Sequence, residues 1–146
     1  MAITRLDHVS VVVEDLPSAI AFFRALGMET QGEAPVEGEW VDRVNGIDDV
    51  RVDIAMMVTP DGNGRLELTS FRSPAAIAGE PSPAPPNVLG LRSVMFAVDD
   101  IDQTVTTLEA HGGVLMGEIV RYEDIYRLCY MRGPAGIIVS LAEELG

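Results

Sequence analysis

The sequence is poor in cysteine and has no long apolar run. Cys129 is the single cysteine of 146 residues, so no disulfide can form within the chain, and a lone thiol fits a reducing compartment. There is no run of about 18 apolar residues, and no basic-then-apolar segment opens the chain, which are the patterns of membrane spans and export signals. We therefore expect a cytoplasmic protein without a membrane partner.

Basic residues are also scarce. Lys and Arg together number 10 against 23 Asp and Glu, which gives a formal net charge of −13. A chain without basic clusters cannot neutralise the phosphates of a nucleic acid, so we expect no nucleic-acid partner. Acidic excess keeps a protein soluble and also attracts cationic small molecules.

The sequence does contain an internal repeat. The stretch LDHVSVVVEDL, residues 6–16, matches LRSVMFAVDDI, residues 91–101, at an offset of 85 positions. Both stretches begin with leucine, continue with alternating valines and end in an acid, an aspartate and an aliphatic residue. Such self-similarity predicts two copies of one supersecondary unit.

Each copy of the repeat predicts a strand followed by a helix. Asp15 precedes the first helix, and Asp100 or Asp102 precedes the second, where a carboxylate can accept the free amides of the first turn. Apolar residues then recur at helical spacing. Gly27 ends the first helix and the pair at 112–113 ends the second.

Strands are predicted after each helix. Residues 50–58 alternate between apolar and polar, a PDGNG turn follows, and residues 65–71 form a further strand. Residues 126–132 and 137–143 repeat this order in the second half. We expect one more strand in each half, between Gly32 and Val50 (around Trp40 or Val41) and near residues 114–120.

The two halves are joined by a proline-rich segment. Residues 73–89 hold five of the nine prolines, which predicts an extended, semi-rigid connection. The predicted organisation is a first βαβββ module at 1–72, the linker at 73–89 and a second module at 90–146. Each module is too small to bury its own sheet, so we expect both to pack into one α+β domain.

Two motifs carry a family resemblance. They are D-H-x-x-x-x-V-x-D-L, residues 7–16, and P-D-G-x-G-x-L-E-L, residues 60–68. With the duplication, the chain resembles the vicinal oxygen chelate superfamily of glyoxalase I, methylmalonyl-CoA epimerase, extradiol dioxygenases and bleomycin-resistance proteins. The resemblance implies a curved, cup-shaped mixed sheet with flanking helices and a divalent metal on its inner face.

Carried over residue by residue, the resemblance implies metal ligands at His8 and Glu67. An imidazole and a carboxylate suit Mn, Fe, Co, Ni or Zn. The matching positions in the second module hold Ser93 and Ser140, whose neutral hydroxyls are poor ligands. We therefore expect an atypical, incomplete metal site or none.

Three explanations of the pair His8 and Glu67 stay open. A chelating substrate completes a weak metal centre that acts as a Lewis acid. Alternatively, one of the two residues is a general base in metal-free chemistry. In the third explanation, both are remnants in a ligand-binding pocket, or Glu67 simply faces solvent.

The strand pattern also predicts the walls of the pocket. Tyr130 with Leu128, or else Cys129 with Met131, faces the ligand, depending on the strand register. Trp40 either stacks on a planar ligand or packs on its own module. The candidate ligand-binding residues are Ser10, Trp40, Arg65, Ser93, Met95, Tyr130 and Ser140.

Two function classes follow from the resemblance. The first is a protein that binds a small organic molecule in the cup, as drug-sequestering resistance proteins do, with an atypical or absent metal site. The second is a metal-dependent lyase, isomerase or epimerase, or dioxygenase that uses His8 and Glu67. Because relatives assemble their modules in pairs, we also expect a homodimer.

Overall fold

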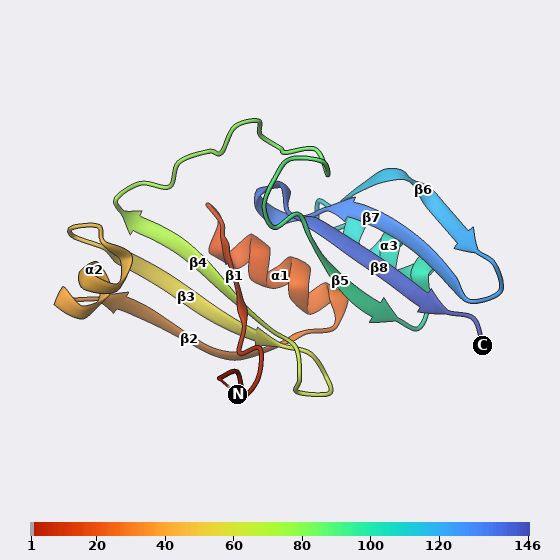
Figure 1. Cartoon of the computed structure of the whole chain (residues 1–146), viewed down its shortest axis with the longest axis horizontal. Helices are drawn as coiled ribbons and strands as arrows, with labels where there is room; N and C mark the ends of the chain where they lie inside the picture. Colours follow the sequence, from red (N-terminus) through yellow and green to blue (C-terminus); the bar gives the residue numbers. More distant parts are fainter. Residues whose placement is uncertain (1) are drawn as a thin grey trace. The chain divides into compact units, whose positions relative to one another are not determined.

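The computed structural model describes residues 2–146, and the chain divides into two compact units, with the boundary in the sequence between Ile77 and Ala78. Each unit holds one four-stranded sheet (Figure 1). The first unit contains β1 (Val9–Val12), α1 (Leu16–Leu26), β2 (Glu29–Glu37), α2 (Glu39–Asn45), β3 (Arg51–Val58) and β4 (Arg65–Ser73). The second contains β5 (Ser93–Val98), α3 (Ile101–Glu109), β6 (Val114–Tyr122), β7 (Tyr126–Arg132), η1 (Pro134–Gly136) and β8 (Ile138–Glu144).

The two sheets have the same topology. Their strand orders are β1-β4-β3-β2 and β5-β8-β7-β6; the first pair of each is parallel and the other pairs are antiparallel. Ser10 pairs with Glu67 in the first sheet, and Met95 pairs with Ser140 in the second. The register thus reproduces the repeat, and the predicted α+β fold of two βαβββ modules is confirmed.

Helix α1 forms where the sequence predicts it. The Asp15 carboxylate accepts the amide of Ser18 at 3.0 Å, and Gly27 ends the helix in a left-handed conformation with a φ of 119° that favours glycine. The helix buries Phe22 and Phe23 and contacts β2, β3 and β4. The opposite face of the first sheet is therefore free of α1.

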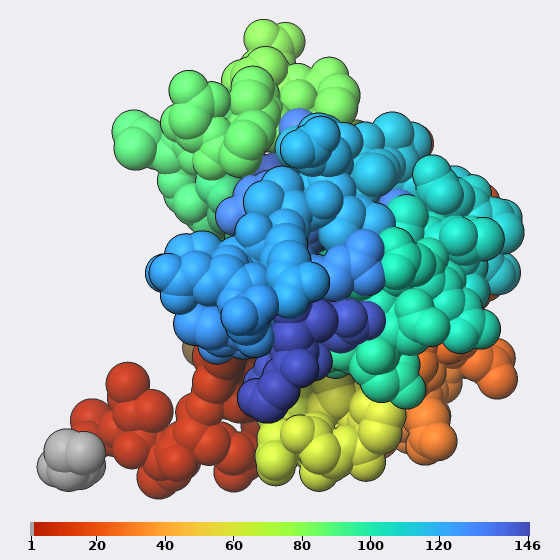
Figure 2. All heavy atoms as spheres, turned by 90° about the vertical axis from the view of Figure 1, so that its right-hand side faces the viewer, coloured from red at the N-terminus to blue at the C-terminus, as the bar shows by residue number. Residues whose placement is uncertain are grey.

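Helix α3 covers one face of the second sheet in the same way. Asp100, rather than Asp102, is its N-cap and accepts the amide of Gln103 at 3.0 Å. The helix buries Ile101, Val105 and Leu108 and contacts β6, β7 and β8. Figure 2 shows α3 and β6 side by side on one surface of this unit.

The strand predicted around Trp40 or Val41 is wrong, because both residues lie in helix α2. The extra strand of the first module is β2, which ends earlier, at Glu37. Gly38 breaks the strand with a φ of 129°, a value that disfavours other residues. Val41 then packs against Val50 and Val52, so burial of its side chain fixes the helix on the sheet.

The proline-rich segment contains no helix or strand between Ser73 and Ser93. Its later part belongs to the second unit: a Cβ added to Gly136 would lie 2.9 Å from the Cβ of Pro83, so the two backbones approach closely there. Among residues 2–146, no helix is both long and apolar enough to cross a membrane.

Candidate functional site

His8 and Glu67 meet on the face of the first sheet opposite α1, called the site face below. The Nε2 atom of His8 lies 3.6 Å from Oε2 of Glu67. His8 immediately precedes β1 rather than lying within it, and Glu67 belongs to β4. About a third of the His8 side chain and a quarter of the Glu67 side chain are exposed. The predicted pair is therefore adjacent and accessible.

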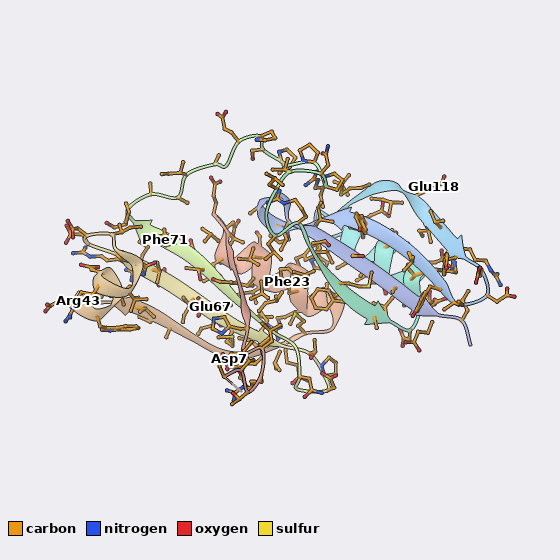
Figure 3. All side chains as sticks on the ribbon, viewed as in Figure 1. Asp7, Phe23, Arg43, Glu67, Phe71 and Glu118 are labelled. Atoms are coloured by element: carbon orange, nitrogen blue, oxygen red, sulfur yellow. The ribbon has the colours of Figure 1, made fainter. Side chains whose placement is uncertain are left out.

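Asp7 sets the orientation of the imidazole. Its Oδ2 lies 2.7 Å from Nδ1 of His8, and because a carboxylate only accepts, Nδ1 carries the hydrogen. The hydrogen bond from His8 and that from Arg5 hold the pKa of Asp7 below its ordinary value, so the carboxylate is ionised at neutral pH. Nε2 is thereby turned toward Glu67 (Figure 3 labels Asp7 and Glu67).

Glu67 is oriented by two hydroxyl groups. Ser10 donates to its Oε1 at 3.3 Å and Thr69 donates to the same oxygen at 3.1 Å. Oε2 is the oxygen that faces His8. Hydrogen bonds thus fix Nδ1 of His8 and Oε1 of Glu67. The other two atoms, Nε2 and Oε2, face each other with a lone pair or a proton.

The two remaining residues of the first unit that the sequence predicts to bind ligand, Arg65 and Trp40, lie at different distances from the pair His8 and Glu67. Arg65 lies on the site face, but its Nη1 is bound to Asp7 at 3.3 Å, and its buried Nε lacks a hydrogen-bond partner among the described residues. Trp40 is 63% exposed on α2, and its neighbour Val41 packs on the sheet instead. The structure therefore places Arg65 beside the pair and does not bring Trp40 to it.

In the second unit the register decides which side chains share a face. Met95, Ser140 and Tyr130 are direct neighbours across β5, β8 and β7. Cys129 and Met131 are buried on the other face, toward α3. Of the two predicted registers, the one that places Tyr130 with Leu128 is the observed one.

The face of the second sheet that holds Met95, Tyr130 and Ser140 presents few polar groups. Met95 is 57% and Tyr130 41% exposed, whereas Ser140 is 1% exposed, and its hydroxyl has no hydrogen-bond partner among residues 2–146. Ser93, the counterpart of His8, is neutral and half-buried. The second unit therefore offers no strong metal donor at either matching position.

Cys129 is a packed thiol. It is buried, and that burial raises the pKa of the thiol above its ordinary value. A thiolate is the reactive form of cysteine, so this side chain is not suited to nucleophilic chemistry.

The donor set fits a divalent ion only in part. His8 and Glu67 supply one imidazole nitrogen and one carboxylate, and within residues 2–146 no group of three or more His, Cys, Asp or Glu is placed to hold a metal. A closed tetrahedral site needs four ligands and an open catalytic site needs three. The residues present suit an ion only when a chelating molecule supplies the missing donors.

Sequence reasoning missed the role of Asp7. The signal was the dipeptide Asp7-His8 itself, since a histidine that ligates or transfers protons commonly has a carboxylate on its second nitrogen. Adjacent residues of a strand point to opposite faces, however, so the sequence argued against this contact. It forms because both residues precede β1.

Comparison with known proteins gives one family match. The model of the Glyoxalase/Bleomycin resistance protein/Dioxygenase superfamily matches residues 5–141. The uncharacterized protein YaeR of Escherichia coli (strain K12) is 27% identical over 147 residues, which cover 99% of this chain and 99% of YaeR.

Two solved structures illustrate the range of the structural likeness. A glyoxalase family protein from Bacillus cereus is 53% identical with a TM-score of 0.94, and the match covers 100% of this chain and 99% of that one. A mutant of the fosfomycin resistance protein FosX from Listeria monocytogenes, complexed with Mn(II) and 1S,2S-dihydroxypropylphosphonic acid, is 13% identical with a TM-score of 0.64. That match covers 99% of this chain and 91% of FosX, and it shows the shared fold alone.

Proposed function

The chain belongs to the Glyoxalase/Bleomycin resistance protein/Dioxygenase superfamily, and from that membership we propose that it binds a small organic molecule whose polar head lies between His8 and Glu67. The observation that carries this proposal is the 3.6 Å approach of His8 Nε2 to Glu67 Oε2. Asp7 accepts a hydrogen bond from Nδ1–H of His8, and the hydroxyls of Ser10 and Thr69 donate to Oε1, the other carboxylate oxygen of Glu67. The facing atoms are both acceptors unless a proton separates them.

Two facing acceptors favour an electropositive guest. A ligand amine placed beside the two atoms can donate one N–H to each of them, and a ligand hydroxyl can donate its single O–H to one of them. A hydrogen bond to a charged carboxylate is stronger than one between neutral groups. The excess of acidic residues over the whole chain also favours a cationic or proton-donating guest.

We propose further that any metal at this position is bound atypically, or that none is bound. His8 and Glu67 are the residues that would hold the ion, and a bound ion would supply Lewis-acid polarisation of a ligand oxygen. The matching residues of the second unit, Ser93 and Ser140, are neutral hydroxyls. The function that this donor set supports best is binding of a chelating or hydrogen-bonding molecule, as expected of a resistance-type binding protein.

A metal-dependent enzyme is the second candidate function, and the contact from Asp7 favours it. Metal-bound histidines almost always donate their other ring N–H to a carboxylate or carbonyl group, and His8 does so to Asp7 at 2.7 Å. In this candidate, His8 and Glu67 orient a substrate for lyase, isomerase or epimerase, or dioxygenase chemistry.

Measurement of bound metal distinguishes these candidates. Purified protein is incubated with Mn, Fe, Co, Ni and Zn, desalted and assayed for each element, together with His8→Ala and Glu67→Ala. His111→Ala is the matched control, because His111 is the other of the two histidines and lies at the end of α3.

Each metal content has one interpretation. Near-stoichiometric metal that is lost in both site variants and retained in His111→Ala supports the metal-dependent enzyme. A metal content of the wild-type protein that is no higher than that of His8→Ala and Glu67→Ala supports metal-free binding. Screening chelating compounds by thermal shift then tests binding itself, and compounds that stabilise His8→Ala as much as the wild type would contradict the proposed site.

We also propose that the protein is a homodimer. The face of the second sheet opposite α3 exposes Met95 and Tyr130, and exposed apolar side chains gathered on one face are common at subunit interfaces. Sedimentation velocity at micromolar concentration should give twice the 15.7 kDa chain mass. A monomeric mass would contradict the proposal.

A further inference from the structure

The site face changes from polar to apolar along the strands. The register places Ser10, Glu67, Met56 and Gly32 in one row across the sheet, and Val12, Thr69, Ile54 and Ala34 in the row nearer α2. Side chains of directly paired residues lie on the same face. The charged pair therefore lies at one end, and the side chains beyond it, Thr69 excepted, are apolar or absent.

Helix α2 closes the apolar end. Val41 of α2 forms a cluster with Val50 and Val52, and Phe71 and Ile54 pack against this cluster. Figure 3 shows Phe71 near α2 and Glu67 farther along the same strand. The distance from Glu67 to Phe71 is four strand residues, or roughly 13 Å at about 3.3 Å per residue.

The side of this surface along β2 is unfilled. A Cβ added to Gly32 meets no atom within 4 Å, and Ala34, the next β2 residue on this face, is exposed. Val12 on the β1 side is also exposed, at 46%. Small residues at 32 and 34 thus leave room for a body that would cover Met56 and Ile54.

We propose that the ligand is amphiphilic, with its polar head at His8 and Glu67 and an apolar chain or ring system that extends over Met56 and Ile54 toward α2. This inference rests on the proposed function, because the head position is taken from it. Gly32 is the specificity-determining residue: its missing side chain admits the apolar body. The surface from Glu67 to Phe71, roughly 13 Å at about 3.3 Å per residue, is longer than an extended eight-carbon chain, so such a chain can lie on it along its whole length.

The test uses two hydroxamates that share one head. Acetohydroxamate has a methyl group and octanohydroxamate a seven-carbon chain, and both present the same chelating, hydrogen-donating head. Isothermal titration calorimetry is run on the full chain with Mn(II) and again with EDTA. Each fully buried methylene adds about fourfold in affinity, so even partial burial should make octanohydroxamate at least about tenfold tighter.

Three variants locate the effect. Gly32→Leu fills the free space and should remove the gain for octanohydroxamate while acetohydroxamate binds as in the wild type. Glu33→Leu is the matched control, since the adjacent residue pairs with Ala55 and faces the α1 side; it should keep the gain. Ala34→Leu repeats the test one row nearer α2 and serves if Gly32→Leu does not fold.

The outcomes separate the two proposals. Equal affinities for both hydroxamates, or a chain-length gain that survives Gly32→Leu and Ala34→Leu, would overturn the apolar subsite while head binding that depends on His8 still supports the proposed function. If His8→Ala binds acetohydroxamate as well as the wild type does, both proposals fall. A gain lost only in the two site-face variants confirms the subsite.

Discussion

At the scale of single residues, the site depends on hydrogen bonds to the atoms of His8 and Glu67 that do not face each other, Nδ1 and Oε1. Asp7 orients the imidazole and hydroxyls of Ser10 and Thr69 orient the carboxylate. The two residues of the pair could be predicted, because each lies in a short sequence motif, His8 in residues 7–16 and Glu67 in residues 60–68. Asp7 was not, because the sequence does not reveal that β1 begins only at Val9.

Replacing Asp7 with Asn should weaken binding at the site. The amide keeps the size of the side chain but removes the charge that fixes the Nδ1 hydrogen of His8. Because loss of such an outer hydrogen-bond partner weakens metal sites, we expect the affinity to fall about tenfold. Calorimetry with Zn(II) and with acetohydroxamate measures the change. Asp61→Asn, in the turn between β3 and β4, is the control, and an unchanged affinity in Asp7→Asn would show that Asp7 does not position the imidazole.

Ser140→Ala should leave stability unchanged or raise it by up to about 1 kcal/mol. The Ser140 hydroxyl is buried without a hydrogen-bond partner among the described residues, and removal of an unsatisfied buried polar group relieves its desolvation penalty. Urea denaturation gives the free energy of unfolding. A loss of more than about 1 kcal/mol would mean that the hydroxyl makes a contact in solution that stabilises the fold.

At the scale of elements, the strength of local signals decided what could be predicted. Both long helices begin at a carboxylate N-cap and α1 ends at glycine, as the pattern indicates. Helix α2 has seven residues and no side-chain cap, and its stability comes from Val41 packing on Val50 and Val52. Tertiary burial of this kind stabilises a helix that the local sequence pattern does not reveal, which is why the pattern predicts a strand at Trp40.

Asp15→Ala should lower the melting temperature by about 3 °C at pH 7, because the cap to Ser18 is lost. Hydrogen bonds from the Ser18 amide and hydroxyl hold the pKa of Asp15 below its ordinary value. The stabilisation is therefore complete above the ordinary pKa of an unfolded aspartate and is lost as pH falls through the lower folded pKa. Melting curves from pH 7 to 3 should show the difference from the wild type shrinking in acid.

The control for this experiment is Asp48→Ala, which removes an exposed loop carboxylate. Its melting temperature should follow the wild type across the same pH range. A difference between Asp15→Ala and the wild type that stays constant into acid would contradict a role for the ionised carboxylate.

At the scale of the whole molecule, the two modules share topology but not chemistry. The rows that hold Ser10 and Glu67 in the first unit hold Met95 and Ser140 in the second. The offset of 85 residues predicts Ser93 in place of His8, and the family resemblance predicts Ser140 in place of Glu67. In the strand registers Ser140 lies opposite Met95, as Glu67 lies opposite Ser10. One module thus provides a polar site and the other an apolar face, so the strong donors of the duplicated fold lie in the first module.

The central claim is that His8 Nε2 and Glu67 hold the guest between them, and imidazole NMR tests it most directly. Long-range ¹H–¹⁵N spectra of labelled protein report both ring nitrogens of the two histidines, and His8→Ala assigns them. On addition of Zn(II) or acetohydroxamate, we predict that the Nε2 resonance of His8 shifts, that its Nδ1 stays protonated by virtue of Asp7, and that His111 does not change. His8 resonances that move no more than those of His111 with either guest would contradict the claim.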